Sequence, residues 1–315
     1  MRKLFTRLAM AAAVACVAVV SGAGMAAAEE RYVFITHGPD SDTWFNVIKN
    51  AIKQAEKDLG VRVDYRNPPT GDLADMARIV QQAAASSPAG IVVTIADYDV
   101  LEKPIRDAIA KGIPVITVNS GTAEQSKKLG ALMHIGQPEY VAGQGAGERA
   151  KQAGVKTFVC VNHFITNPVS VQRCQGYADA LGVKLGDQMI DSGIDPTEVY
   201  NKTKAYLTTH PDTQGILTLG PNSAEPVIKL IRDMGATKYN FITFDLSSDI
   251  VKAIKDGVVT AAIDQQPFLQ GYLPISFLHY YNRFGVIPPM NINTGPGFVT
   301  KANVALVEKY SGEYR

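Results

Sequence analysis

The sequence lacks the local motifs that mark the commonest hydrolases and nucleotide-dependent enzymes. It contains no Walker A motif, no G-x-S-x-G nucleophile elbow and no H-E-x-x-H metal motif. Glycine-rich residues 143–147 do not fit G-x-G-x-x-G and lie in a helical pattern, so we interpret them as helix-packing residues. The histidines form no cluster with cysteines that would indicate a metal site. We therefore expect a protein that is not an enzyme and holds neither a metal nor another cofactor.

Long apolar runs are also scarce. The longest, residues 8–20, follows three basic residues and precedes the small residues 26–28, so residues 1–28 are predicted to be a secretory signal peptide. This run is too short for a comfortable membrane span. A lipoprotein signal at Cys16 is the alternative, although the residues before it match that motif poorly. We expect export to the periplasm.

No basic cluster follows the predicted signal peptide. Removal of Arg2, Lys3 and Arg7 with that peptide takes the formal net charge from +1 to −2. Nucleic acid and anionic membranes attract strongly basic surfaces. Neither is therefore expected as a partner.

Cysteine is limited to Cys160 and Cys174 beyond the predicted signal peptide. The first lies in an apolar strand pattern and the second in the following helix, so the two could face each other across one layer. An oxidising compartment permits a disulfide between them, and the alternative is a pair of buried free thiols. Because the spacing is not C-x-x-C, neither is expected to be a nucleophile or a metal ligand.

What the chain does contain is a repeated alternation of apolar strands and amphipathic helices. This pattern is typical of βαβ units with parallel sheets, and it starts again with the expected helix at residues 141–152. Helix 268–284 and the Pro/Gly-rich residues 287–297 then indicate a return to the first half and a further crossing. The expected strands are residues 32–36, 61–65, 91–95 and 115–118, then 157–161, 183–185, 215–219, 241–244 and 258–263.

Polar residues follow two neighbouring strands near the end of this pattern. Asp245 ends an apolar strand, and Gln265 follows the next strand after one intervening helix. Ligands of open parallel sheets bind outside the carboxyl ends of the strands. These two side chains therefore predict a site for a ligand rich in hydroxyl groups.

The loop after the first strand carries further candidates. Asp40 and Asp42 are either paired carboxylates or metal ligands, or they are loop and N-cap acids ahead of the next helix. For Asp42 we favour a functional role. Trp44 and Phe45 are adjacent, so they cannot both lie on the core stripe of that helix, and at least one ring can face a cleft. His37 is interpreted as structural, with ligand contact as the alternative.

Several segments together resemble a known family. The resemblance lies in their order and spacing over the whole chain after residue 28, since no segment is specific by itself. They are residues 112–120 (GIPVITVNS), 134–136 (HIG), 173–176 (RCQG), 215–222 (GILTLGPN), 244–245 (FD) and 262–267 (AIDQQP). The chain resembles the type I periplasmic binding proteins of bacterial ABC importers, in the ribose-binding-like branch for simple sugars.

The resemblance implies an α/β fold of two Rossmann-like lobes joined by three hinge crossings. The first lobe is expected at residues 29–135 plus 266–290, and the second at residues 136–265 plus 291–315. Such a protein closes on its ligand by a hinge motion. A monomer is expected.

The resemblance also implies a binding site, by matching positions. Asn222, Asp245 and Gln265 match the family's residues, whereas Asn119 replaces an aspartate and Ser120 a frequent arginine. The cleft arginine of the second lobe has no counterpart, since its place falls near Val171 and Arg173 matches a structural arginine; Asn167 or His163 is the hypothetical substitute. The expected ligand-binding set is Asp42, Trp44, Phe45, Asn119, Ser120, Asn167, Asn222, Asp245 and Gln265.

Such a set favours an uncharged ligand. Carboxylates and carboxamides pair with hydroxyl groups, and aromatic rings cover the apolar face of a sugar. The expected function is capture of a neutral monosaccharide or polyol for an ABC permease. The alternatives are a sugar-binding protein that docks on a chemoreceptor or sensor, and an exported α/β enzyme.

Overall fold

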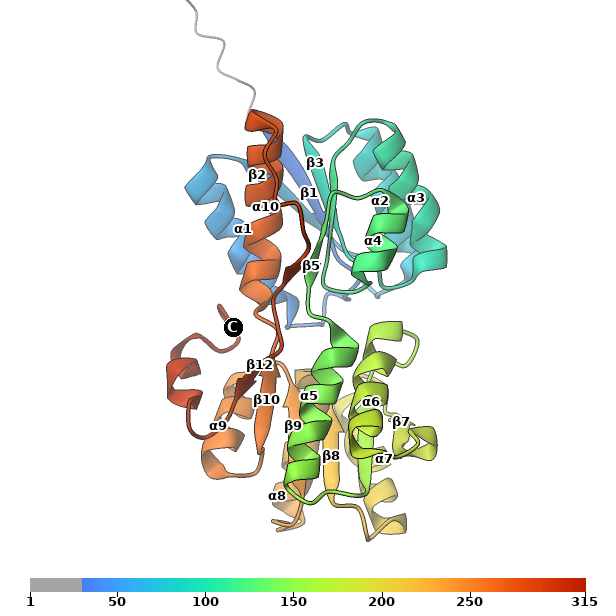
Figure 1. Ribbon diagram of the computed structural model, residues 1–315, viewed down its shortest axis with the longest axis vertical. Helices are drawn as coiled ribbons and strands as arrows, with labels where there is room; N and C mark the ends of the chain where they lie inside the picture. The colour runs from blue at the N-terminus through green and yellow to red at the C-terminus, as the bar shows by residue number, and fades with distance from the viewer. Residues whose placement is uncertain (1–29) are drawn as a thin grey trace, which may run out of the picture.

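The computed structural model describes residues 30–315 and shows two α/β lobes, one above the other (Figure 1). The predicted signal peptide, residues 1–28, lies outside the described residues. Among the helices of residues 30–315, none combines the length and the apolar composition needed to cross a membrane. The two-lobed α/β architecture expected from the sequence is confirmed.

The first lobe is built on a parallel sheet with the order β11-β5-β4-β3-β1-β2. Helices α1 and α10 pack together over one face, while α2 and α3 cover the other (Figure 1). The strands are β1 (Arg31–Ile35), β2 (Arg62–Arg66), β3 (Gly90–Val93), β4 (Val115–Val118), β5 (His134–Gly136) and β11 (Ile292–Asn293). The helices are α1 (Phe45–Leu59), α2 (Leu73–Ala85), α3 (Tyr98–Ala110), α4 (Ala123–Leu129) and α10 (Pro267–Phe284).

The second lobe has the sheet order β12-β10-β9-β8-β6-β7, in which only the β10–β12 pair is antiparallel within the described chain. Helices α5 and α6 cover one face, and α7, α8 and α9 cover the other. The strands are β6 (Phe158–Asn162), β7 (Met189–Asp191), β8 (Gly215–Thr218), β9 (Asn240–Phe244), β10 (Ala261–Asp264) and β12 (Gly297–Val299). The helices are α5 (Glu139–Gln152), α6 (Pro168–Leu181), α7 (Pro196–Thr209), α8 (Pro221–Asp233) and α9 (Ser248–Asp256), with the 3-10 turns η1 (Gly186–Gln188), η2 (Val304–Leu306) and η3 (Glu308–Tyr310).

Close helix packing explains the small residues 143–147. A Cβ atom at Gly143 would overlap the backbone carbonyl of Arg173, and one at Gly176 would overlap the carbonyl of Tyr140. Helices α5 and α6 can therefore approach each other backbone to backbone. This confirms the interpretation of the segment as helix-packing residues.

The structure corrects two expected strands. Residues 183–185 are not a strand: Val183 and Leu185 pack into the core beside α6, and the strand β7 follows only after η1. Strand β10 begins at Ala261, because the backbone N–H groups of Val258 and Val259 both donate to Ala253 O at the end of α9. Apolar composition alone did not separate these core residues from strand residues.

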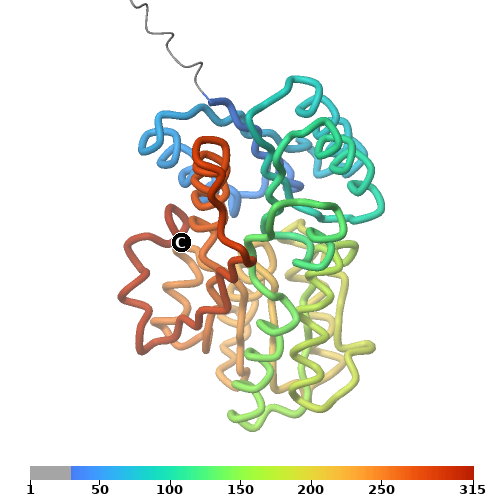
Figure 2. Tube along the Cα trace, turned by 45° about the horizontal axis from the view of Figure 1, so that its top comes forward, coloured from blue at the N-terminus to red at the C-terminus, as the bar shows by residue number. Residues whose placement is uncertain are grey.

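The chain crosses between the lobes after β5, after β10 and after β11 (Figure 2). The expected boundary between residues 290 and 291 precedes the third crossing. Because β11 pairs in parallel with β5, residues 292–293 still belong to the first sheet, and the crossing lies between β11 and β12. Two strands as short as these carry no sequence pattern that would reveal their partners.

Cys160 and Cys174 form a disulfide, with an S–S distance of 2.06 Å and a Cα–Cα distance of 5.8 Å. It joins β6 to the helix that covers it, α6. Of the two alternatives for this pair, the structure therefore shows the bridge. Both residues are completely buried, which leaves them no role at the protein surface.

Candidate functional site

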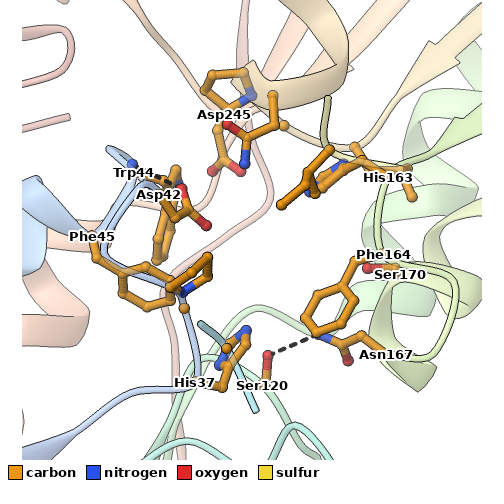
Figure 3. A pocket seen from close by; sticks show the side chains of 18 of the residues that line it. His37, Asp42, Trp44, Phe45, Ser120, His163, Phe164, Asn167, Ser170 and Asp245 are labelled. Atoms are coloured by element: carbon orange, nitrogen blue, oxygen red, sulfur yellow. Dashed lines mark hydrogen bonds between the residues drawn. The ribbon is translucent and has the colours of Figure 1, made fainter. Parts of the chain in front are cut away.

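A cavity of about 450 Å³ lies between the two lobes, at the carboxyl ends of strands from both sheets. Figure 3 shows Asp42, Trp44 and Phe45 on one side, and His163, Phe164 and Asn167 on the other. All nine residues of the expected set line this cavity. The topology thus brings together side chains that are up to 223 positions apart in the sequence, from Asp42 to Gln265.

The first lobe contributes an acid and two aromatic rings. Asp42 Oδ1 accepts a hydrogen bond from the Trp44 backbone N–H at 3.1 Å, which holds the carboxylate at the start of α1. The rings of Trp44 and Phe45 meet edge to face, with their centroids 5.0 Å apart. Phe45 is buried against Gly38, where a side chain would collide with its ring. Phe45 therefore anchors the loop in the core while one edge of it borders the cavity, and Trp44 is held at the cavity.

Trp44 also brings a polar atom. Its indole nitrogen is buried and has no hydrogen-bond partner among residues 30–315. It lies close enough to Asp245 in the other lobe to favour the ionised form of that carboxyl group and so to lower its pKa. A buried indole N–H ordinarily has a partner. The Asp245 carboxyl group is the acceptor toward which this N–H is placed.

The backbone is left-handed where the strands reach the cavity. Asn119 after β4, Asp245 after β9 and Gln266 after β10 have φ angles of 57°, 62° and 54°. Positive φ angles are uncommon outside glycine, and such strained residues cluster at functional sites. This geometry turns the side chains of Asn119 and Asp245 from the strand ends toward the space between the lobes.

Amide groups connect these strand ends. Gln265 Nε2 donates to Asp245 Oδ1 at 2.8 Å, and Asn119 Nδ2 donates to Gln265 Oε1 at 3.2 Å. Asn119 belongs to the first lobe and Asp245 to the second. One chain of hydrogen bonds therefore crosses the joint between the lobes at the inner end of the cavity.

The lobes also touch at a second place along the cavity. Asn167, the N-cap of α6, accepts from the Val169 N–H and donates from Nδ2 to Ser120 Oγ at 3.3 Å (Figure 3). The rings of His37 and Phe164 stack across the gap with their centroids 5.9 Å apart. These contacts between lobes show a closed arrangement.

Arg173 lines the cavity but its guanidinium is already occupied. Its Nε and Nη2 donate to the Glu139 carboxylate at 2.6 and 2.8 Å, and its Nη1 donates to Leu219 O at 2.8 Å. The guanidinium also lies over the Phe244 ring, 4.3 Å from its centroid. Arg173 therefore forms part of the wall, in agreement with its interpretation as a structural arginine, and also contributes positive charge near Asp245.

Several lining residues were absent from the expected set. They lie in the loops or helix starts that follow other strands of the two sheets, and none forms a motif with its sequence neighbours. Their positions after β1, β2, β6 and β7 are the one signal that could have found them. They include Thr70, Phe164, Ser170 and Ile194, together with His37 and His163, the two histidines named above as alternatives.

Burial controls the charge of the cavity. It raises the pKa of Asp42 above the ordinary carboxyl value and raises that of Asp245 to about 7, against the opposing effects of Arg173 and Gln265. It lowers the pKa of His37 and of His163 to about 4, so both rings are neutral at pH 7. Among the described residues, no group of three or more His, Cys, Asp or Glu side chains is arranged to hold a metal ion.

The pKa of Asp245 predicts a pH-dependent stability of the ligand-free protein. Between pH 3.8 and about 7 the folded state retains a proton that the unfolded chain has released. This contribution therefore favours folding at low pH and is lost as the pH rises toward 7. In urea unfolding from pH 5 to 8, the unfolding free energy of wild type minus that of Asp245→Asn should fall with pH and then level off above pH 7.

The subtraction is necessary because buried histidines titrate in the opposite sense. His37, His134 and His163 have lowered pKa values, so their contributions grow as the pH rises from about 4 to 6.5 and cancel between the two proteins. A difference that stays constant from pH 5 to 8 would show that Asp245 is ionised throughout.

Two lobes, three crossings and a cavity of polar and aromatic side chains at the strand ends define a hinged binding protein. A family model described as a periplasmic binding protein domain matches residues 32–283, and the chain belongs to that family. The resemblance drawn from the sequence is thereby confirmed.

Individual relatives agree with this assignment. The chain is 27% identical to the xylose/arabinose-binding protein XylF of Sulfolobus acidocaldarius, over 90% of this chain and 74% of that protein. It is 28% identical to the ribose import binding protein RbsB of Salmonella typhimurium, over 85% of this chain and 88% of that protein. A solved carbohydrate transporter from Acidothermus cellulolyticus, in complex with myo-inositol, is 32% identical with a TM-score of 0.83, covering 90% of this chain and 98% of that one.

Proposed function

We propose that this protein binds a neutral monosaccharide or polyol between its lobes and delivers it to an ABC permease. The observation that supports this most directly is the polarity of the cavity. Its acceptors and donors are carboxylates, carboxamides, hydroxyls, neutral imidazoles and an indole N–H, and the guanidinium of the sole arginine among its described lining residues is paired with Glu139. Hydroxyl groups both donate and accept, so one kind of ligand group can pair with all of these.

The charge of the cavity argues against acidic ligands. Asp42 and Asp245 contribute negative charge wherever they are ionised, and no free guanidinium is present among the described lining residues to pair with a carboxylate or phosphate on the ligand. Like charges at close range in a buried site repel strongly. Sugar acids and sugar phosphates should therefore bind poorly.

The nature of the relatives supports the same class. Their names refer to xylose, arabinose and ribose, and the solved relative holds myo-inositol. The nine lining residues inferred from the family act as the binding set in this proposal, with Trp44 covering the apolar face of the ring. A missing hydroxyl would leave a buried partner unpaired, so discrimination between close sugars is expected to be sharp.

The proposal includes an exported monomer that performs no catalysis, since its relatives are named as binding proteins. Closure around the ligand would present one surface, formed by both lobes, to the permease. The same surface of the closed protein could also dock on a chemoreceptor, so that binding of one sugar would serve both transport and sensing.

A thermal-shift screen tests this function. The chain from Glu29 onward is melted with neutral sugars, polyols, sugar acids and nucleosides. A ligand that binds only the folded state raises the melting temperature by mass action, by roughly 2.7 kcal/mol of stability at 100 times its Kd. We expect a shift with a neutral sugar or polyol.

A variant makes the screen specific to the cavity. Asn222→Ala removes a lining amide that also helps to keep Asp42 ionised across the gap, and it should abolish the shift without lowering the melting temperature of the ligand-free protein appreciably. A shift with sugar acids or nucleosides alone, or an unchanged shift in Asn222→Ala, would contradict the proposal.

A further inference from the structure

We propose that Gln270, which does not line the cavity, is the positioning residue that sets the direction of two amides of the binding site, those of Asn119 and Gln265. The inference rests on the proposed function, because it concerns the same site. Gln270 lies in the first turn of α10, directly after the second crossing, and its side chain is completely buried. It reaches three residues that are distant from it along the chain or belong to other elements.

The hydrogen bonds of Gln270 use both ends of its carboxamide. Its Nε2 donates to Gln265 O at 3.1 Å, to Gln265 Oε1 at 3.0 Å and to Thr294 Oγ1 at 2.9 Å. Its Oε1 accepts from Asn119 Nδ2 at 3.1 Å. The group is therefore fully used, and no part of it remains for a ligand.

A single backbone carbonyl determines the direction of this network. Gln265 O can only accept, so the nitrogen of Gln270 must face it and the oxygen of Gln270 must face Asn119. Asn119 must then present its nitrogen, which also donates to Gln265 Oε1. Gln265 in turn directs its own nitrogen to Asp245 Oδ1. The orientation of three side-chain amides follows from this acceptor, and the Asp245 carboxylate at the other end of the network requires the same orientation of Gln265.

The direction of these hydrogen bonds explains why position 119 is an asparagine. An aspartate there, as the family resemblance would suggest, would point a carboxylate oxygen at the oxygens of both Gln265 and Gln270. The network could not reverse, because the Gln270 oxygen would then face the Gln265 backbone carbonyl. With Gln270 in place, position 119 therefore needs a side chain that can donate a hydrogen bond to the Gln270 oxygen, as asparagine does.

The network also reaches all three crossings. Gln265 lies at the second, and Thr294, which is 1% exposed, lies at the third. The Thr294 N–H donates to Gly136 O at the first crossing at 2.9 Å, and Gln266 Nε2 donates to Thr294 O at 2.7 Å. Gln270 thus ties the residues that face the ligand to the segments about which the lobes move.

A double-mutant cycle in ligand-free protein tests the positioning role. Asn119→Asp should lower the folding equilibrium constant on the order of tenfold or more, since it buries opposed acceptors. In the Gln270→Met background that loss should be at least about fivefold smaller, because the Gln270 oxygen, one of the two acceptors that would oppose the aspartate, is then gone. Urea unfolding of the four proteins measures this coupling.

A matched control separates positioning from space filling. Ser276 is a buried polar residue of the same helix whose hydroxyl bonds only to Tyr272 O within the described chain, so Ser276→Ala should show no coupling to Asn119→Asp. Additive effects of Gln270→Met and Asn119→Asp would overturn the proposal.

Binding provides a second readout. Trp44, the one tryptophan of the sequence, lies at the cavity and reports occupancy by fluorescence titration with myo-inositol, D-xylose or D-ribose. For a probe that wild type binds, Gln270→Met should weaken the affinity by roughly tenfold while Ser276→Ala leaves it unchanged. An unchanged affinity in Gln270→Met would contradict the positioning role. If wild type binds no probe, the proposed function is weakened, and the unfolding cycle alone decides the role of Gln270.

Discussion

Replacing Asp245 with alanine is expected to weaken sugar or polyol binding by about 100-fold or more while both lobes stay folded. The carboxylate stands at the end of β9, almost fully buried, and hydrogen bonds to a charged group contribute about 1.5–3 kcal/mol each. The substitution also removes the acceptor of Gln265 Nε2, which leaves a buried donor unpaired beside the ligand. Isothermal titration with the ligand identified by the thermal-shift screen measures the loss.

Asp40 provides the matched control for this experiment. It is an acid of the same first-lobe loop as Asp42, but it does not line the cavity, and its carboxylate accepts from Asn67 Nδ2 at 2.9 Å. Asp40→Ala should leave the affinity unchanged within about twofold, since exposed polar contacts contribute little. Normal binding by Asp245→Ala would show that the ligand lies elsewhere.

Replacing Arg173 with alanine is expected to lower the free energy of unfolding by about 3–5 kcal/mol, because the change leaves Glu139 as an uncompensated buried charge. The side chains of the pair are only 8% and 2% exposed, and the guanidinium also holds a backbone carbonyl of the strand-end loop. Urea unfolding of the ligand-free protein measures the effect.

Two comparisons identify the cause. The double variant Arg173→Met with Glu139→Gln should recover much of the loss, since the isolated charge is gone. The exposed pair between Arg232 and Asp256, at 3.0 Å, provides the control: Arg232→Ala should cost less than about 1 kcal/mol. A loss of less than 1 kcal/mol in Arg173→Ala would mean that Glu139 is protonated or reached by water.

The local sequence determined the elements and the edge at which the site lies. Apolar runs specified most strands, and side-chain caps such as Asp72, Asp97 and Ser247 with left-handed glycines such as Gly60 began and ended the helices. Polar residues directly after β9 and β10 marked the carboxyl edge of the sheet. These features depend on neighbours a few positions apart, which is why they can be read along the chain.

Only the tertiary structure decided which distant groups meet. The pairing of β11 with β5, the closure contacts of Ser120 with Asn167, and the occupation of Arg173 by Glu139 join residues from different elements or lobes. Gln270 lies on a largely apolar helix that carries no polar motif, yet it contacts Asn119 across 151 positions. The sequence by itself thus determined where the strands with clear apolar runs end and which polar side chains stand there. The direction of their hydrogen bonds was decided by the fold, because an amide has no preferred orientation until a partner with only one possible role, here the Gln265 carbonyl, is placed beside it.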